Sequence, residues 1–129
     1  MKREADFNST FRSWLKANPM PSAAFELKQT TTDSLPFSSV KDHQLWALLA
    51  VKNNQLLFKI PDAGYQNPFD FFYFNQAKAY VVIKYPDFFC VIDIDDWIKE
   101  NASSVRRSLT SERAKAIAKE TVLLLRQSQ

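Results

Sequence analysis

The chain contains a single glycine, a single cysteine and a single histidine among its 129 residues. One glycine is too few for the glycine-rich phosphate loops of P-loop proteins and dinucleotide-binding folds, so both kinds of nucleotide site are excluded. One histidine and one cysteine cannot supply the ligands of a structural zinc site. A serine hydrolase would depend on His43, and the sequence has no G-x-S-x-G nucleophile elbow. Several common enzyme classes are therefore ruled out.

Cysteine usage and hydropathy indicate the compartment. Cys90 has no second cysteine in the sequence with which to form a disulfide, which is typical of a protein from a reducing cytoplasm. Its neighbours Phe89 and Val91 indicate a structural residue on a strand. The apolar runs are far shorter than a membrane span, and no charged-then-apolar leader is present. We expect a soluble, cytoplasmic protein without a membrane partner.

Hydrophobic and aromatic residues are abundant. They include eleven Phe, four Tyr and three Trp, and 46% of the chain is hydrophobic. This content is ample for one buried core in a domain of this size, so residues 1–129 are expected to form a single domain. The formal net charge of +3 is compatible with a nucleic-acid partner without demanding one.

Hydrophobic periodicity predicts helices at both ends of the chain and strands between them. Phe7, Phe11, Trp14 and Leu15 recur at helical spacing. The expected helices cover residues 6–18, from Ser38 or Ser39 to about Asn53, from Asp95-Asp96 through Trp97, and 110–126, with a linker at 103–108 before the last one. The expected strands cover 23–29, 56–60, 69–74, 79–85 and 88–94. This order favours an α/β fold with a mixed sheet flanked by helices.

Glu26 and Lys28 stand out in the first expected strand. Residues two apart share one face of a strand, so these two lie opposite Phe25 and Leu27. One interpretation is an ion pair on a solvated strand edge. The apolar surroundings instead favour an inner strand, where an unpaired charge is costly, and perturbed charges of this kind cluster at functional sites.

Asp70 is a second acid within an apolar segment, between Phe69 and Phe71. It could simply lie at a solvated strand end. If its strand lies beside that of Glu26 and Lys28, however, two carboxylates and an ammonium converge. Carboxylates hold a divalent cation and an ammonium offsets the charge of a phosphodiester, so the set predicts phosphodiester chemistry.

Other polar residues have simpler alternatives. Asp95 or Asp96 is expected to cap the helix that carries Trp97, with Asp93 at the preceding strand end, rather than to form a metal cluster. Gln44 lies on the second helix, where solvated surface is the common outcome. Candidate phosphate contacts, with solvated surface as the alternative, are Arg106, Arg107, Lys41 and Lys59.

Three short motifs then follow one another in order. They are Phe25-Glu26-Leu27-Lys28, Leu35-Pro36-Phe37 and His43-Gln44. Together they resemble the RecU-type Holliday-junction resolvases of the PD-(D/E)xK nuclease superfamily, over roughly residues 23–97. The resemblance implies a restriction-endonuclease-like fold and a Mg²⁺- or Mn²⁺-dependent endonuclease from a bacterium or phage, which cuts four-way DNA junctions as a homodimer.

The resemblance also implies roles for individual residues. Glu26, the carbonyl of Leu27 and Glu4 on the first helix would bind the metal. Lys28 would hold the attacking water or the scissile phosphate, and Gln44 would orient the site. In the family an aspartate precedes the E-x-K strand, but residues 17–24 contain no acid. Asp70, or Asp62 as the alternative, would then supply this ligand from later in the chain. Another nuclease of the superfamily, or an inactive DNA-binding protein of the same fold, remains an alternative.

Overall fold

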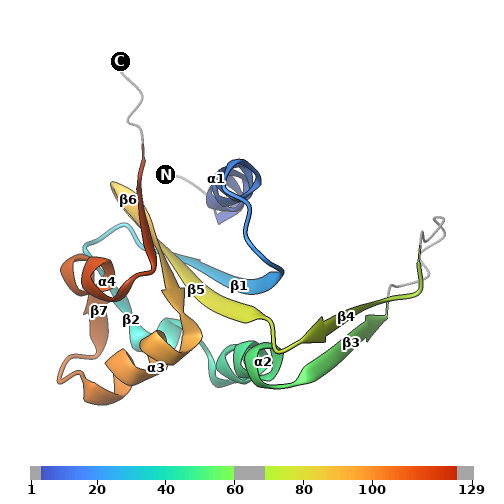
Figure 1. Ribbon diagram of the computed structural model, residues 1–129. Helices are drawn as coiled ribbons and strands as arrows, with labels where there is room; N and C mark the ends of the chain where they lie inside the picture. The colour runs from blue at the N-terminus through green and yellow to red at the C-terminus, as the bar shows by residue number, and fades with distance from the viewer. Residues whose placement is uncertain (1–3, 60–68, 125–129) are drawn as a thin grey trace.

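A four-stranded mixed sheet forms the centre of the protein (Figure 1). The computed structural model describes residues 4–59 and 69–124, with the side chains from residue 6 onward. In the sheet, β1 runs parallel to β5, β5 antiparallel to β6, and β6 antiparallel to β8. The strands span Ala23–Gln29 (β1), Lys78–Tyr85 (β5), Phe88–Asp93 (β6) and Glu120–Leu123 (β8).

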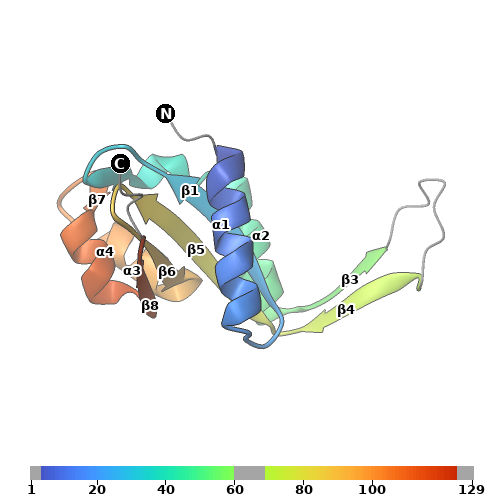
Figure 2. The same ribbon diagram turned by 90° about the horizontal axis from the view of Figure 1, so that it is seen from above.

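Helices cover both faces of this sheet (Figure 2). On one face, α1 (Glu4–Ala17) packs Phe7 and Phe11 against Tyr80, Val82 and Phe89 of the two central strands. The other face is covered by α2 and α3, which contribute side chains to a second buried cluster. These two helices span Asp42–Asn53 (α2) and Ile94–Ser103 (α3). The chain is thus a single α/β domain, as the sequence predicts.

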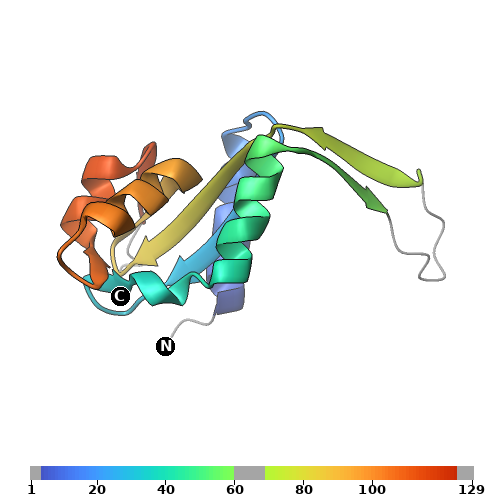
Figure 3. The ribbon, with the colours of Figure 1, turned by 90° about the horizontal axis from the view of Figure 1, so that it is seen from below.

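Two smaller sheets complete the fold. β2 pairs with β7 in an antiparallel sheet, next to the 3₁₀ turn η1 and helix α4. β3 and β4 pair with each other and project away from the central sheet as an arm (Figure 3). These elements span Ser34–Pro36 (β2), Phe37–Ser39 (η1), Gln55–Lys59 (β3), Phe71–Asn75 (β4), Ser108–Thr110 (β7) and Ser111–Ile117 (α4).

Most predicted elements are confirmed, but the C-terminal region differs. The predicted helix over 110–126 ends at Ile117, and residues from Glu120 add to β6 as strand β8. The β-branched side chains of Thr121 and Val122 favour an extended backbone, and β6 offers a free edge to pair with. The predicted linker at 103–108 is followed by a short strand, β7, and not directly by a helix. Leu109 in this strand is buried in the core.

The N-cap of α3 also lies two or three residues earlier in the sequence than predicted. Neither Asp95 nor Asp96 caps the helix; the N-cap is Asp93, whose side chain accepts a hydrogen bond from the backbone N–H of Asp95. The strand therefore passes directly into the helix, and Asp95 and Asp96 occupy the first helical turn, where acids interact well with the helix dipole.

Among the described residues, no helix is long and apolar enough to cross a membrane. The longest described helix is α1, which has 14 residues and lies on the sheet with one apolar face. A transmembrane helix needs about 20 consecutive apolar residues.

Cys90 lies in the middle of β6 and is fully buried. Burial raises the pKa of its thiol, against a lowering contribution from Thr121, so little thiolate forms at neutral pH. We expect the native protein to react with a thiol reagent at pH 8 roughly 100-fold more slowly than the protein in urea, because modification requires local opening. The reaction of Cys90 with the reagent can be followed spectroscopically. Equal reaction rates in buffer and in urea would contradict the burial of Cys90 in β6.

Candidate functional site

Strand β1 places Glu26 and Lys28 on the face of the sheet that α2 covers. Glu26 is paired in register with Val81, and Lys28 with Ile83, both of which belong to the buried cluster beneath α2. Phe25 and Leu27 pack on the opposite face, in the cluster beneath α1. The predicted division of β1 into a charged and an apolar face is confirmed.

The carboxylate of Glu26 is the centre of a three-residue contact. Lys28 Nζ lies 3.4 Å from Glu26 Oε2, and Gln44 Nε2 donates a hydrogen bond to the same oxygen at 3.3 Å. Gln44 is held in turn, because its Oε1 accepts a hydrogen bond from the backbone N–H of Lys41 at 2.9 Å. The first turn of α2 therefore fixes the amide that contacts Glu26, a contact that spacing alone did not predict.

The site lies at the edge of the sheet. β1 is the terminal strand of the described order β1-β5-β6-β8, so the expectation of an inner strand is wrong. The side chains of Glu26 and Lys28 are 27% and 21% exposed. Both side chains are thus largely shielded but remain accessible to water. Because the pair is partly solvated, the attraction between the charges contributes little to stability.

Few donors for a divalent cation meet at this site. Among the described residues, no group of three or more His, Cys, Asp or Glu side chains comes together. Mg²⁺ is commonly bound through one or two carboxylates, with water and substrate phosphates completing its octahedron. Glu26 offers one carboxylate, and the carbonyl of Leu27 is the second ligand that the resemblance implies. The side chain of Glu4 lies outside the described part of the chain.

Asp70 is not brought to this site. It is exposed and immediately precedes β4, whose first residues lie at the end of the arm farther from the central sheet (Figure 3). The predicted convergence of Asp70 with Glu26 required their strands to be neighbours. Instead, β4 pairs with β3, and β1 pairs with β5. Asp62 lies outside the described residues.

The predicted basic residues fall into two groups. Arg106, Arg107 and Lys41 are exposed around η1, and the backbone N–H of Phe37 in that turn donates to the carbonyl of Arg107 at 2.9 Å. This group lies near the start of α2, which also carries Gln44. Lys59 is exposed on the arm at the end of β3 and is separate from the others.

The sequence did not predict the ion-pair cluster of Lys52 with Asp93 and Asp95. Lys52 Nζ lies 2.7 Å from Asp93 Oδ1 and also contacts Asp95, which links α2 to the start of α3. Burial lowers the pKa of Lys52, but the hydrogen bonds to the two carboxylates outweigh this, and the pKa is raised. Both acids therefore neutralise Lys52, and Asp93 also caps α3. No spacing rule connects Lys52 with them, because the contact depends on how α2 and α3 pack.

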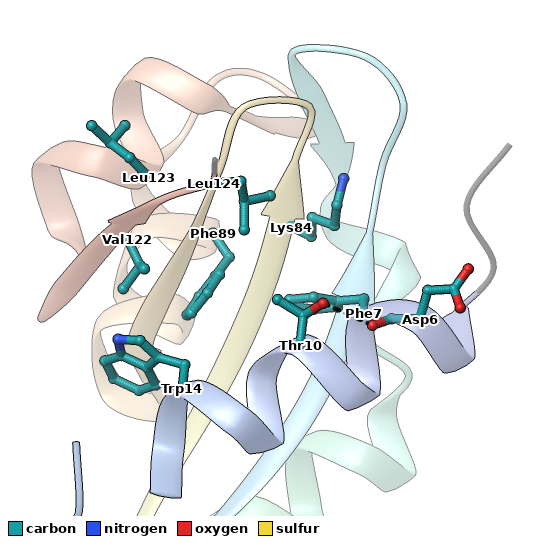
Figure 4. A pocket seen from close by; sticks show the side chains of 9 residues that line it. All are labelled: Asp6, Phe7, Thr10, Trp14, Lys84, Phe89, Val122, Leu123 and Leu124. Carbon is teal, nitrogen blue, oxygen red and sulfur yellow. Dashed lines mark hydrogen bonds between the residues drawn. The ribbon is translucent and has the colours of Figure 1, made fainter. Parts of the chain in front are cut away.

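A cavity of about 340 Å³ lies on the other face of the sheet (Figure 4). Its walls come from α1, β5, β6 and the C-terminal strand, and they are mostly apolar, with Phe7, Trp14 and Phe89 as the large side chains. Asp6, Thr10 and Lys84 add polar groups. Because it lies beneath α1, this cavity is separate from the Glu26 site beneath α2.

Comparison of the chain with protein-family models, with curated proteins and with solved structures gives no match in any of the three. Any function must therefore be inferred from the residues of this chain. The feature that points to a function is the contact of Glu26 with Lys28 and Gln44 at the partly exposed edge of the sheet.

Proposed function

We propose that this protein is a metal-dependent DNA endonuclease that cuts branched DNA, of the Holliday-junction-resolving kind and with a restriction-endonuclease-like fold. The observation that carries the proposal is the position of Glu26, whose Oε2 is contacted by both Lys28 and Gln44 on a partly exposed strand. The order of the E-x-K, Pro-Phe and His-Gln motifs supports the same class.

Each residue of the site has a part in phosphodiester hydrolysis. Glu26 and the carbonyl of Leu27 would hold Mg²⁺ or Mn²⁺, which when bound supplies stabilisation of the charge on the phosphoryl oxygens. The ammonium of Lys28 is placed to donate hydrogen bonds to the attacking water or to a phosphate oxygen. Gln44 keeps the carboxylate of Glu26 in one orientation through its hydrogen bond. Arg106, Arg107 and Lys41 are exposed and would contact flanking phosphates.

The proposal includes a homodimer in the cytoplasm of a bacterium or an infected host. A four-way junction is resolved by two symmetric cuts, and one protomer offers one Glu26 site. A two-fold dimer supplies the second site with the matching symmetry.

A DNA-binding protein without cleavage is the second candidate. The position of Asp70 favours this candidate. Because Asp70 lies on the arm, the site has the carboxylate of Glu26 but not the expected pair of carboxylates. Such a protein would bind DNA through its exposed cations, with a strong dependence on salt and no dependence on metal.

The deciding experiment is cleavage of a labelled four-way junction, with linear duplex as the control, in Mg²⁺, Mn²⁺ or EDTA. We expect symmetric, metal-dependent cuts in the junction only. Equal cutting of the linear duplex would replace the resolvase assignment by a general nuclease of the superfamily. Binding without cutting in any metal would favour the second candidate. If the wild-type protein cleaves the junction and the Asp70→Asn variant does not, then the carboxylate of Asp70 takes part in the reaction.

A further inference from the structure

The cavity beneath α1 lies between this helix and the C-terminal strand (Figure 4). Its floor is closed by Phe7 and Phe89, which are 2% and 1% exposed. Val122 and Leu124 line it from the C-terminal side and are only partly buried. β8 is the outer strand of the described sheet, whereas α1 packs on the two central strands. The apolar side chains next to β6 are therefore left partly uncovered, above a buried floor.

The size of this cavity favours a small molecule over a segment of protein. Its volume of about 340 Å³ lies at the lower end of the range for small-molecule sites. Asp6 and Trp14 line its two ends and are eight residues apart on α1, so the cavity is about 12 Å long. A helix with its side chains is about 10 Å wide and would need a longer groove. A molecule of one or two fused rings fits these dimensions.

Aromatic rings build the apolar part of the cavity. The ring of Trp14 meets that of Phe89 edge-on, with centroids 5.4 Å apart. The rings of Phe7 and Phe89 are 5.7 Å apart and inclined at 57°. Aromatic rings prefer such inclined contacts, and a flat aromatic ligand would extend the same arrangement. A flexible aliphatic chain would lose more conformational freedom on binding, so the walls favour an aromatic ligand.

The polar part of the cavity indicates the charge and the hydrogen bonding of the ligand. Asp6 and Lys84 lie toward one end, and Thr10 lies between them and Trp14 (Figure 4). An anion would be repelled by Asp6 and a cation by Lys84, so a neutral molecule is favoured. The hydroxyl of Thr10 donates its hydrogen to the carbonyl of Asp6 at 2.9 Å. Its oxygen can still accept a hydrogen bond, which favours a ligand with an N–H or O–H group.

We propose that this cavity binds a small, uncharged aromatic molecule of about the size of indole that donates one hydrogen bond. Its ring lies against Trp14 and Phe89, and its N–H or O–H group donates to Thr10 Oγ1. Such a ligand joins α1 to the C-terminal strand. The site goes beyond the proposed nuclease and does not depend on it, because Glu26 and Lys28 lie on the opposite face of the sheet.

The test is a titration of the full-length protein with indole, followed by the amide signals in NMR spectra. We expect a dissociation constant below about 1 mM, with the largest shifts in α1 and β8. N-methylindole lacks the N–H donor and should bind about 10-fold more weakly. Indoleacetate, an anion, and tryptamine, a cation, should both bind more weakly than indole. Tighter binding of either charged compound would overturn the assignment of a neutral ligand.

Variants of Thr10 separate the hydrogen bond from the fit of the ring. Thr10→Val removes the hydroxyl at nearly constant volume, so it should weaken indole about 10-fold and leave N-methylindole within about 2-fold. Thr10→Ser keeps the acceptor and should bind indole as wild type does. Ser9→Ala is the matched control, because it removes a hydroxyl from the next residue of α1, which does not line the cavity.

Three results would overturn the proposal. The first is no binding of indole to the wild-type protein at about 5 mM. The second is binding whose shifts lie outside α1, β5, β6 and β8. The third is equal affinity of wild type and Thr10→Val for indole, since Thr10 would then accept no hydrogen bond from it.

Discussion

Replacement of Glu26 by glutamine is expected to lower the rate of metal-dependent junction cleavage roughly 100- to 1000-fold, with little effect on folding. The substitution preserves the size of the side chain and an oxygen that Lys28 and Gln44 can still contact. It removes the negative charge with which the side chain would hold a divalent cation. The loss should therefore appear in the rate of cleavage in Mg²⁺ and in Mn²⁺, measured with a labelled junction under single-turnover conditions.

Glu120→Gln is the matched control for this experiment. Glu120 is exposed on β8, at the opposite edge of the sheet from β1, and the same charge is removed there. We expect its cleavage rate to stay within about 3-fold of wild type, since it lies away from the proposed site. The thermal midpoints of both variants should match that of wild type. Full activity of Glu26→Gln would remove Glu26 from the reaction, and equal losses in both variants would point to a general charge effect.

The part of the site that could be predicted from sequence is the part that lies within one strand. The bounds of β1 and the assignment of Glu26 and Lys28 to one face follow from strand alternation, because the apolar Phe25 and Leu27 have to face the core. The contact with Gln44 joins β1 to α2, which are separated along the chain by β2 and η1, and the motif order suggested it without giving its geometry.

The position of Asp70 could not be predicted in the same way. Its segment was identified as a strand, but the sequence does not specify which strand becomes its neighbour. The apolar runs at residues 56–60 and 69–74 can pair with each other as readily as with the central sheet. In the structure they form the β3–β4 hairpin, which closes a shorter loop than pairing with β1 would. The strand near Asp70 was predicted correctly, but its partner was not, and for this reason Asp70 lies away from Glu26.

The C-terminal strand illustrates a different limit. The residues after Ile117 include Leu123 and Leu124, which continue a helical pattern, and local propensity alone does not decide between helix and strand. The decision comes from the exposed edge of β6, to which residues from Glu120 are hydrogen-bonded. Val122 also packs against the cluster beneath α1. Long-range packing therefore overrides the local signal at this end of the chain.

The largest effect on stability is expected for Trp97→Ala, which should lower the free energy of unfolding by about 3–5 kcal/mol. Trp97 is fully buried in α3, and its ring meets that of Phe37 edge-on, with centroids 5.2 Å apart. It joins α3 to η1, the turn that precedes α2 and Gln44, so its removal leaves a large cavity between these elements. Urea unfolding followed by circular dichroism measures the change.

Two further substitutions distinguish the cost of the cavity at Trp97 from the other effects that removing a tryptophan has on the free energy of unfolding. Trp46→Ala removes the same side chain where it is 69% exposed, so a loss below about 1 kcal/mol is expected. Trp97→Phe keeps most of the ring. Because Trp97 Nε1 is buried and has no hydrogen-bond partner among the described residues, the phenylalanine gives up no hydrogen bond. Its cost should therefore be roughly 1–2 kcal/mol, which is the cost of the smaller void alone. A loss as large as that of Trp97→Ala would mean that the indole N–H has a partner in solution.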